Sequence, residues 1–170
     1  MDTLGGLAFA GEAALPSYMK EAPKKRDEPI LNRYMIGQIA FSSIFTVGLY
    51  LFFLLSPRTV SLFRQSYDDI YLLTAFFALF IFTSVFHCFN CRTDRLLLFS
   101  GLSKNKAFIT IILLVLSIQL VFIYLGASVL RTAPLLFSEL VSVFAISLLV
   151  FPADMLRKLW RRFRGKRGGF

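Results

Sequence analysis

The sequence predicts an all-α integral membrane protein, a helical bundle with a partial N-terminal helix and four membrane-spanning helices. The first observation is the composition, because 56% of the 170 residues are hydrophobic and 16% are aromatic, more than a soluble domain contains. The second is the presence of four apolar runs of about 20 residues, the length of a helix that crosses a bilayer. The third is that the charges gather between these runs instead of along one face of them.

The first element is predicted at residues 1–18, a short apolar run that ends just after Pro16. It contains three glycines, which weaken a helix and allow neighbouring helices to approach closely. We expect this segment to be the C-terminal part of a membrane helix whose upper part precedes the chain. Glu12 then lies near the cytoplasmic end of that helix, where a charge costs less.

Four full spans follow, and each is predicted because the run is long, apolar and almost free of charge. The second run contains no lysine, arginine, aspartate or glutamate and one histidine, His87, and Glu139 lies near the start of the fourth. A soluble helix of this length usually shows a polar stripe, which these runs lack. The spans are expected near residues 36–55, 70–89, 107–127 and 135–153.

The spans form one predicted transmembrane domain at residues 36–156, with charged segments on either side of it. Residues 19–35 are expected to form a cytoplasmic connection, and residues 157–170 a basic cytoplasmic tail. Sixteen of the 19 lysines and arginines lie in these two segments and in the connection at 92–106. The positive-inside rule therefore predicts a multi-pass protein with a cytoplasmic C-terminus.

A few polar residues interrupt the spans. We expect Gln119 and Glu139 to make packing or interface contacts rather than to line an ion pathway. Cys88 and Cys91, next to His87, have a spacing that suits a thiolate metal or redox site. The sequence offers no second ligand pair, so unligated thiols at a helix end and a hydrogen-bonded histidine are the favoured interpretation.

The predicted tail interleaves basic residues with Leu159, Trp160 and Phe163. Such a segment can bind anionic lipid or a calmodulin-like partner, but an ordinary cytoplasmic membrane anchor has the same pattern and is favoured. Nucleic acid is not an expected partner, because the basic residues flank membrane spans instead of forming a folded patch.

Asp2 is the candidate site residue of the chain. A carboxylate at membrane depth is energetically expensive, so it indicates a functional site such as a cation ligand. The alternative is a carboxylate that caps the start of a helix. Residue chemistry alone leaves both interpretations open.

The residues at 1–12, Met-Asp-Thr-Leu-Gly-Gly-Leu-Ala-Phe-Ala-Gly-Glu, resemble the sixth membrane helix of P-type calcium-transporting ATPases. The segment Lys20–Leu31 is similar to the cytoplasmic connection after that helix, above all in the plasma-membrane and bacterial branches. The rest of the chain resembles the last four helices of such a ten-helix transporter in length and spacing. The resemblance implies that Asp2 is a ligand of the transported cation, calcium or a similar divalent ion, and that Thr3 can add a hydroxyl.

The sequence departs from the family pattern in two places. Glu12 is followed by alanines, and the first proline comes only at Pro16. Some members carry a further carboxylate at the end of the eighth helix, which corresponds to Phe86–Arg92, where no acid occurs. By resemblance, this difference favours one cation site over two.

The phosphorylated aspartate of the family lies in an Asp-Lys-Thr-Gly loop, and this chain contains no Asp-Lys-Thr. Phosphoryl transfer needs a positioned nucleophile, a metal ion and groups that stabilise charge. We therefore expect the chain alone neither to hydrolyse ATP nor to hold a cofactor. The resemblance implies magnesium-ATP for a full-length parent, in which Met1 is an internal methionine.

We therefore expect the C-terminal membrane domain of a P-type ATPase that couples ATP hydrolysis to calcium transport. The chain is expected to supply part of the cation site and the supporting helices. Its expected partners are the lipid bilayer, calcium, and the missing N-terminal part of the ATPase or another membrane protein, and its expected location is the plasma membrane. The alternative is a stand-alone, non-enzymatic small membrane protein that acts as a transporter subunit or regulator. A small permease is disfavoured, because no inverted repeat is visible.

Overall fold

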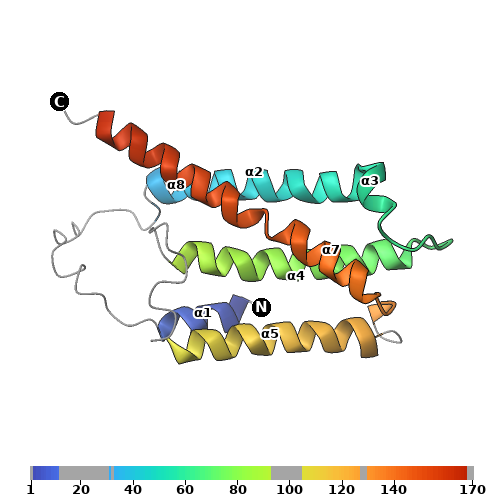
Figure 1. Ribbon diagram of the computed structural model, residues 1–170. Helices are drawn as coiled ribbons and strands as arrows, with labels where there is room; N and C mark the ends of the chain where they lie inside the picture. Colours follow the sequence, from blue (N-terminus) through green and yellow to red (C-terminus); the bar gives the residue numbers. More distant parts are fainter. Residues whose placement is uncertain (1, 12–30, 32, 93–104, 127–129, 168–170) are drawn as a thin grey trace.

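The computed structural model describes residues 2–11, 31, 33–92, 105–126 and 130–167. The described residues form helices without strands (Figure 1). A helix satisfies every backbone polar group internally, which lipid demands of an apolar chain. The helices are α1 (Asp2–Ala10), α2 (Arg33–Leu55), α3 (Pro57–Val60), α4 (Ile70–Arg92), α5 (Lys106–Leu125), α7 (Phe137–Ser147) and α8 (Val150–Arg167).

The predicted helical bundle with four membrane spans is confirmed. Four stretches of helix are long and apolar enough to cross a membrane. The fourth of them runs through both α7 and α8, so the predicted span at 135–153 is a pair of shorter helices. The four stretches are Met35–Leu55, Ile70–Arg92, Lys106–Leu125 and Phe137–Arg161.

The fourth span bends at Leu148 and Leu149, and Pro152 supplies the reason. Proline has no backbone N–H, and its ring clashes with the carbonyl four residues earlier, which here belongs to Leu148. The chain tightens locally instead, because Leu149 N donates to Ile146 O at 3.1 Å and Phe151 N donates to Leu148 O at 3.0 Å. The bend lets the two halves of one span cross their neighbours in different directions.

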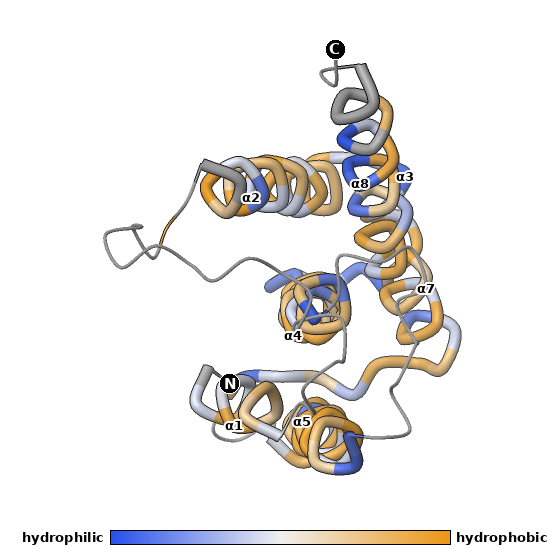
Figure 2. Tube along the Cα trace, turned by 90° about the vertical axis from the view of Figure 1, so that its left-hand side faces the viewer, coloured by the Kyte–Doolittle hydropathy of each residue, from blue (hydrophilic) through white to orange (hydrophobic). Residues whose placement is uncertain are grey.

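Helix α4 lies at the centre of the bundle. Viewed from one end, α2, α5 and the α7–α8 pair surround it (Figure 2), and α4 contacts each of them. Small buried residues such as Ala75 and Ala78 allow this close approach, as is usual between membrane helices. The outer faces carry many exposed large apolar side chains, which is the surface that lipid requires.

Aromatic pairs fill the space between α4 and the bent span. Phe86 packs against Phe144 of α7 with ring centroids 5.5 Å apart, and against Phe151 of α8 at 4.9 Å. Phe82 also contacts Phe144, at 5.7 Å. Such pairs contribute about 0.5–1.5 kcal/mol each beyond their buried area. One ring on α7 and one on α8 therefore hold both halves of the bent span to one central helix.

The bundle has two unlike ends. The basic end, as we call it, is where α2 and α5 begin, α4 ends and α8 lies (Figure 1). The opposite end holds α3, the start of α4 and the start of α7. The segments 19–35, 92–106 and 157–170 contain most of the basic residues. Because of the helix directions, the described residues that border these segments all lie at the same end of the bundle.

Candidate functional site

Helix α1, which begins with the candidate ligand Asp2, lies beside the first half of α5. Asn105 makes the junction, because its amide Nδ2 donates to Ala8 O at 3.3 Å while its Oδ1 accepts from Phe108 N at 2.8 Å. The same side chain therefore caps α5 and holds α1. Ala8 is buried, and Phe9 packs on Phe108 with centroids 5.9 Å apart.

The glycines of this segment divide between a packed face and an open face. A Cβ added at Gly11 would meet Ala107 Cβ at 3.2 Å and Asn105 Oδ1 at 3.3 Å. Gly11 thus fits the close approach that its residue type predicts. A Cβ at Gly5 or Gly6 would meet nothing within 4 Å among the described residues, so that face of α1 has no packing partner there.

The position of α1 sets the depth of Asp2. Helices α1 and α5 run antiparallel (Figure 1). Asp2 precedes Ala8 by six residues, which corresponds to about 9 Å along a helix axis. The backbone of Asp2 therefore lies beside α5 about a third of the way along that helix, rather than at its end. The side chain of Asp2, Glu12 and the remainder of the predicted segment to residue 18 lie outside what the structure describes, so the ligand role stays a prediction.

Glu139 forms the most extensive polar contact at the opposite end of the bundle. Its carboxylate accepts two hydrogen bonds from the Arg64 guanidinium, both at 3.1 Å, and one from Arg64 N at 3.0 Å. It also accepts from Leu136 N at 2.7 Å, which caps α7. Arg64 further donates to Pro134 O at 2.7 Å and stacks over the Tyr71 ring at 4.0 Å. This cluster joins the loop before α4 to the loop before α7.

The Arg64–Glu139 pair is unequal in its exposure. The side chain of Glu139 is 3% exposed, whereas that of Arg64 is 39% exposed. The hydrogen bonds to Glu139 raise the pKa of Arg64 above its ordinary value, so the arginine carries its charge at any physiological pH. The sequence predicts a packing or interface role for Glu139 but does not identify its partner. The sequence contains one indication of this partner, because Arg64 is among the few basic residues on the same side of the spans as Glu139.

A second polar cluster lies at the basic end and is also buried. Asp154 pairs with Arg157 and with Lys158, each at 2.7 Å. Lys158 Nζ donates to Asn90 O at 3.1 Å, and Asn90 Nδ2 donates to Val150 O at 3.1 Å. The sequence assigns Arg157 and Lys158 to a basic tail, but both side chains are less than 10% exposed. They belong to the packed bundle, where they hold α8 to the end of α4.

The other polar residues singled out in the spans occupy separate places. His87 Nε2 lies 2.7 Å from Thr46 Oγ1, which links α4 to α2. Gln119 is buried in α5, and its amide nitrogen has no hydrogen-bond partner among the described residues. Cys88 is half-buried against the core and Cys91 is exposed. Within the described part of the chain, no three His, Cys, Asp or Glu residues come close enough together to hold a metal ion.

Comparison with known proteins agrees with this architecture. Residues 1–160 match the family described as "Cation transporting ATPase, C-terminus". Relatives include calcium-transporting ATPase 12, plasma membrane-type, of Arabidopsis thaliana, 28% identical over 124 residues, which are 72% of this chain and 12% of the relative. Calcium-transporting ATPase 5, plasma membrane-type, of Oryza sativa is 32% identical over 70% of this chain and 11% of its own length. Calcium-transporting ATPase PAT1 of Dictyostelium discoideum is 26% identical over 92% of this chain and 15% of its own length. The chain thus spans about an eighth of the length of these curated relatives.

We predict that Gly11→Leu separates α1 from α5, because the added side chain has no space beside Ala107 and Asn105. Overpacking costs about 1–3 kcal/mol, so amide hydrogen exchange within α1 should accelerate by about tenfold. Exchange is measured by mass spectrometry on the chain in detergent micelles. Gly6→Leu is the matched control, because it makes the same change on the open face and should not accelerate exchange. Equal acceleration in both variants would contradict the α1–α5 contact.

We predict that Glu139→Gln lowers the free energy of unfolding by roughly 2–3 kcal/mol, because it leaves buried donors poorly satisfied. Arg64→Gln should cost less, because Arg64 is partly exposed. The two changes together should cost less than the sum of the single changes, which marks a direct interaction. Unfolding is followed by circular dichroism in micelles.

The control for this pair is Arg58→Gln, which removes an exposed charge from α3 at the same end of the bundle. Its effect should stay within about 0.5 kcal/mol. If Glu139→Gln had an effect as small as that of Arg58→Gln, the Glu139 cluster would not hold the loops together.

Proposed function

The chain belongs to the family of cation-transporting ATPase C-terminal regions, and from this premise we propose that it forms the membrane part of a pump that moves calcium. The observation that carries the proposal is the family match over residues 1–160, which includes α1 and extends into α8. Relatives named as calcium-transporting ATPases supply the choice of ion. The pump also needs a part that hydrolyses magnesium-ATP, and the phosphorylation motif of that part is absent from this sequence.

Asp2 is the proposed calcium ligand of this chain. Its backbone lies about a third of the way along α5 from the basic end, a depth at which a carboxylate is costly unless it has a partner. Calcium binds 6–8 oxygen atoms, so Asp2 and the exposed Thr3 can supply only part of the set. The open face at Gly5 and Gly6 is a suitable surface for further helices that bring the remaining ligands.

The four spans are proposed to support the transport helix rather than to conduct the ion. The acids that the structure describes within these spans are Glu139 and Asp154, and both are engaged in ion pairs at opposite ends of the bundle. Between them, α4 makes mainly apolar and aromatic contacts. Such a module resists deformation when a neighbouring helix moves.

The proposed orientation has the basic end in the cytoplasm. The positive-inside rule favours this arrangement, because lysines and arginines concentrate at that end. The plasma membrane is the proposed location, in keeping with relatives described as plasma membrane-type.

We predict that Asp2→Asn abolishes most of the ATP-dependent calcium uptake that depends on this chain. Loss of a ligand should weaken calcium affinity by more than about tenfold, since even supporting residues around metal sites cost that much. Radioactive calcium uptake is measured in inside-out membrane vesicles from cells that produce the chain with its native partners, and from cells that lack it.

Asp68→Asn is the matched control, because it makes the same chemical change in an exposed loop and should leave uptake near the wild-type rate. Uptake that survives Asp2→Asn would refute the ligand assignment. No difference between cells with and without the wild-type chain would refute the calcium pump itself and favour a non-enzymatic subunit or regulator.

We predict that the two ends of the bundle differ in chemical accessibility. In a chain with Cys88 and Cys91 replaced by serine, Ser61→Cys at the opposite end should react with a membrane-impermeant maleimide in intact cells. Lys106→Cys at the basic end should react only after the membrane is permeabilised. The reverse pattern would show that the basic end faces outward.

A further inference from the structure

Asn105 joins the ends of two helices through one side-chain amide. Its Oδ1 accepts a hydrogen bond from Phe108 N at 2.8 Å, and its Nδ2 donates one to Ala8 O at 3.3 Å. The N–H of Phe108 belongs to the first turn of α5, and the carbonyl of Ala8 belongs to the last turn of α1. Groups at the ends of helices lack a partner from the regular pattern of their own helix. The Asn105 side chain therefore lies where both helices need a polar partner.

The junction around Asn105 is closed to its surroundings. Asn105 is 2% exposed, Ala8 is 1% exposed and Phe108 is fully buried. A buried backbone carbonyl that loses its donor is costly, above all in a membrane protein, where no bulk water can replace the donor. The bond from Asn105 to Ala8 O is therefore a strong constraint on where α1 lies against α5.

Phe108 connects the same junction to the central helix. Its ring packs edge-on against Phe89 of α4, with the two centroids 5.1 Å apart. Phe9 of α1 also packs on the ring of Phe108, at 5.9 Å. The start of α5 is thus held by α4, and α1 is held by the start of α5. Asn105 is the polar step in this connection.

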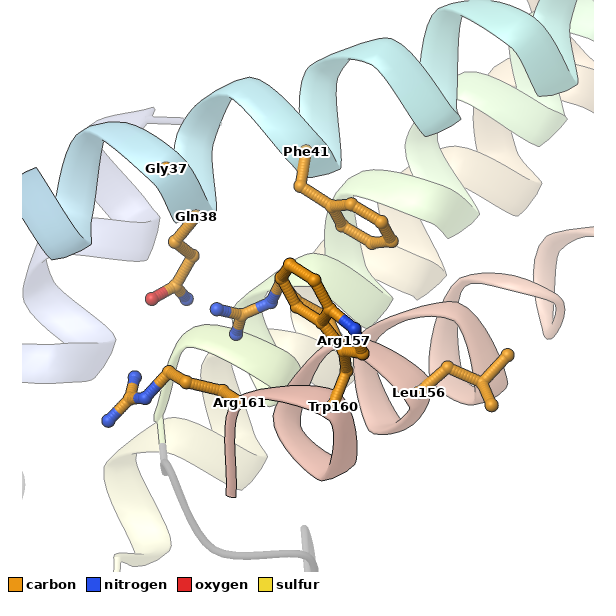
Figure 3. Close-up of a pocket in the computed structure, with 7 residues that line it drawn as sticks. All are labelled: Gly37, Gln38, Phe41, Leu156, Arg157, Trp160 and Arg161. Carbon is orange, nitrogen blue, oxygen red and sulfur yellow. The ribbon is translucent and has the colours of Figure 1, made fainter. Parts of the chain in front are cut away.

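Open crevices lie between other helices of the bundle. One of about 720 Å³ separates α2 from α8 and is lined by Phe41 of α2 and by Leu156 and Trp160 of α8 (Figure 3). Another, of about 600 Å³, lies between α2 and α4. Open space can absorb a small movement of a helix, whereas closely packed residues transmit it. The packed junction of α1 with α5 is therefore the better suited to fix the position of a helix.

The position of α1 decides where Asp2 can meet a cation. Six residues separate Asp2 from Ala8 within one unbroken helix, a distance of about 9 Å along the axis. A shift of α1 at Ala8 therefore moves the backbone of Asp2 as well. The face of α1 at Gly5 and Gly6 has no packing contact among the described residues that could prevent such a shift. A ligand binds an ion best when supporting residues hold it in place beforehand.

We propose that Asn105 is a positioning residue for the calcium site, which acts by fixing the depth of α1 and hence of Asp2. It does not contact the ion itself, because it lies beside Ala8, almost two turns of α1 from Asp2. This inference rests on the proposed calcium transport. The fraction of molecules that hold α1 in place then sets the apparent calcium affinity. Loss of the bond to Ala8 O should therefore weaken calcium binding and leave later steps of the pump intact.

Asn105→Ser separates the two hydrogen bonds of the side chain. Serine is a good helix cap, so its hydroxyl can still accept from Phe108 N, but its side chain is too short to reach Ala8 O. Amide hydrogen exchange of the full chain in micelles should accelerate by about tenfold in α1, as expected for the loss of a buried hydrogen bond, and stay near the wild-type rate in α5. Asn105→Asp is the second variant and should give the same result, because an ionised carboxylate accepts but cannot donate to Ala8 O.

Calcium uptake is measured over a range of calcium concentrations, in inside-out vesicles from cells that produce the chain with its native partners. Both Asn105 variants should raise the concentration at half-maximal uptake by about threefold to tenfold and keep the maximal rate near the wild-type value. A general loss of structure would instead lower the maximal rate. The matched control is Tyr124→Phe, which removes a side-chain hydrogen bond to Leu135 O from the other end of α5 and should change neither value.

The possible contrary results are distinct. Unchanged exchange in α1, or equal acceleration in α1 and α5, would show that Asn105 does not hold α1 specifically. An unchanged half-maximal concentration in both variants, with a working wild-type pump, would refute the positioning role alone. An equal rise in Tyr124→Phe would attribute the effect to general weakening of the bundle. Absence of calcium uptake with the wild-type chain would refute the proposed pump, and the positioning role with it.

Discussion

The ion pair between Glu139 and Arg64 is the contact on which the arrangement of the bundle depends. Apolar helices in lipid gain little from hiding apolar surface, because lipid tails are as apolar as their neighbours. Their register must therefore come from contacts that are correct in only one alignment. Glu139 supplies one, because its carboxylate binds Arg64 by both side chain and backbone and also caps α7 through Leu136 N. It fixes how α7 lies on α4, the pair with the most extensive contact in the described structure.

The cluster of Asp154, Lys158 and Asn90 fixes α8, the other half of the bent span, against the end of α4. Its one carboxylate, Asp154, pairs with both Arg157 and Lys158, and Lys158 also reaches the last turn of α4 through Asn90 O. The central helix is thus held at both ends by polar contacts and between them by aromatic packing. Helix α1 is attached differently, through the capping residue Asn105 and a glycine contact. This difference in attachment is what the proposed roles require, a fixed support for the four spans and a transport helix for α1.

The number of spans and the helical class were predictable from sequence, because hydropathy is a local property that a window of residues reports. The pairing of Glu139 with Arg64 was not predictable, because the two residues are 75 positions apart in the sequence. Taken with its own neighbours, each looks like an ordinary charged residue in a loop or at the start of a helix. The burial of Lys158 was not predictable for a similar reason. Lys158 looks like the start of a solvated tail, but Asp154 lies one turn before it and draws it into the bundle. Pro152 was a visible sign of the bend, although the continuous apolar run concealed its effect.

For the candidate site, the sequence predicted an apolar helix rich in glycine, and α1 has that form. It did not predict that one face of α1 would pack on α5 while the face of Gly5 and Gly6 stays open. That division depends on Asn105, whose position beside Ala8 arises only when distant segments meet.

The bend in the fourth span also bears on the thickness of membrane that the protein can occupy. Phe137–Arg167 contains 31 residues, which as one straight helix would measure about 46 Å, well beyond a hydrocarbon core of about 30 Å. Because the chain turns at Leu148 and Leu149, α8 can lean toward the membrane surface while α7 keeps its place on α4. A thinner or thicker bilayer then changes the tilt of α8 without disturbing the Glu139 contact. The bundle is therefore expected to tolerate hydrophobic mismatch at its basic end and to resist it at the other.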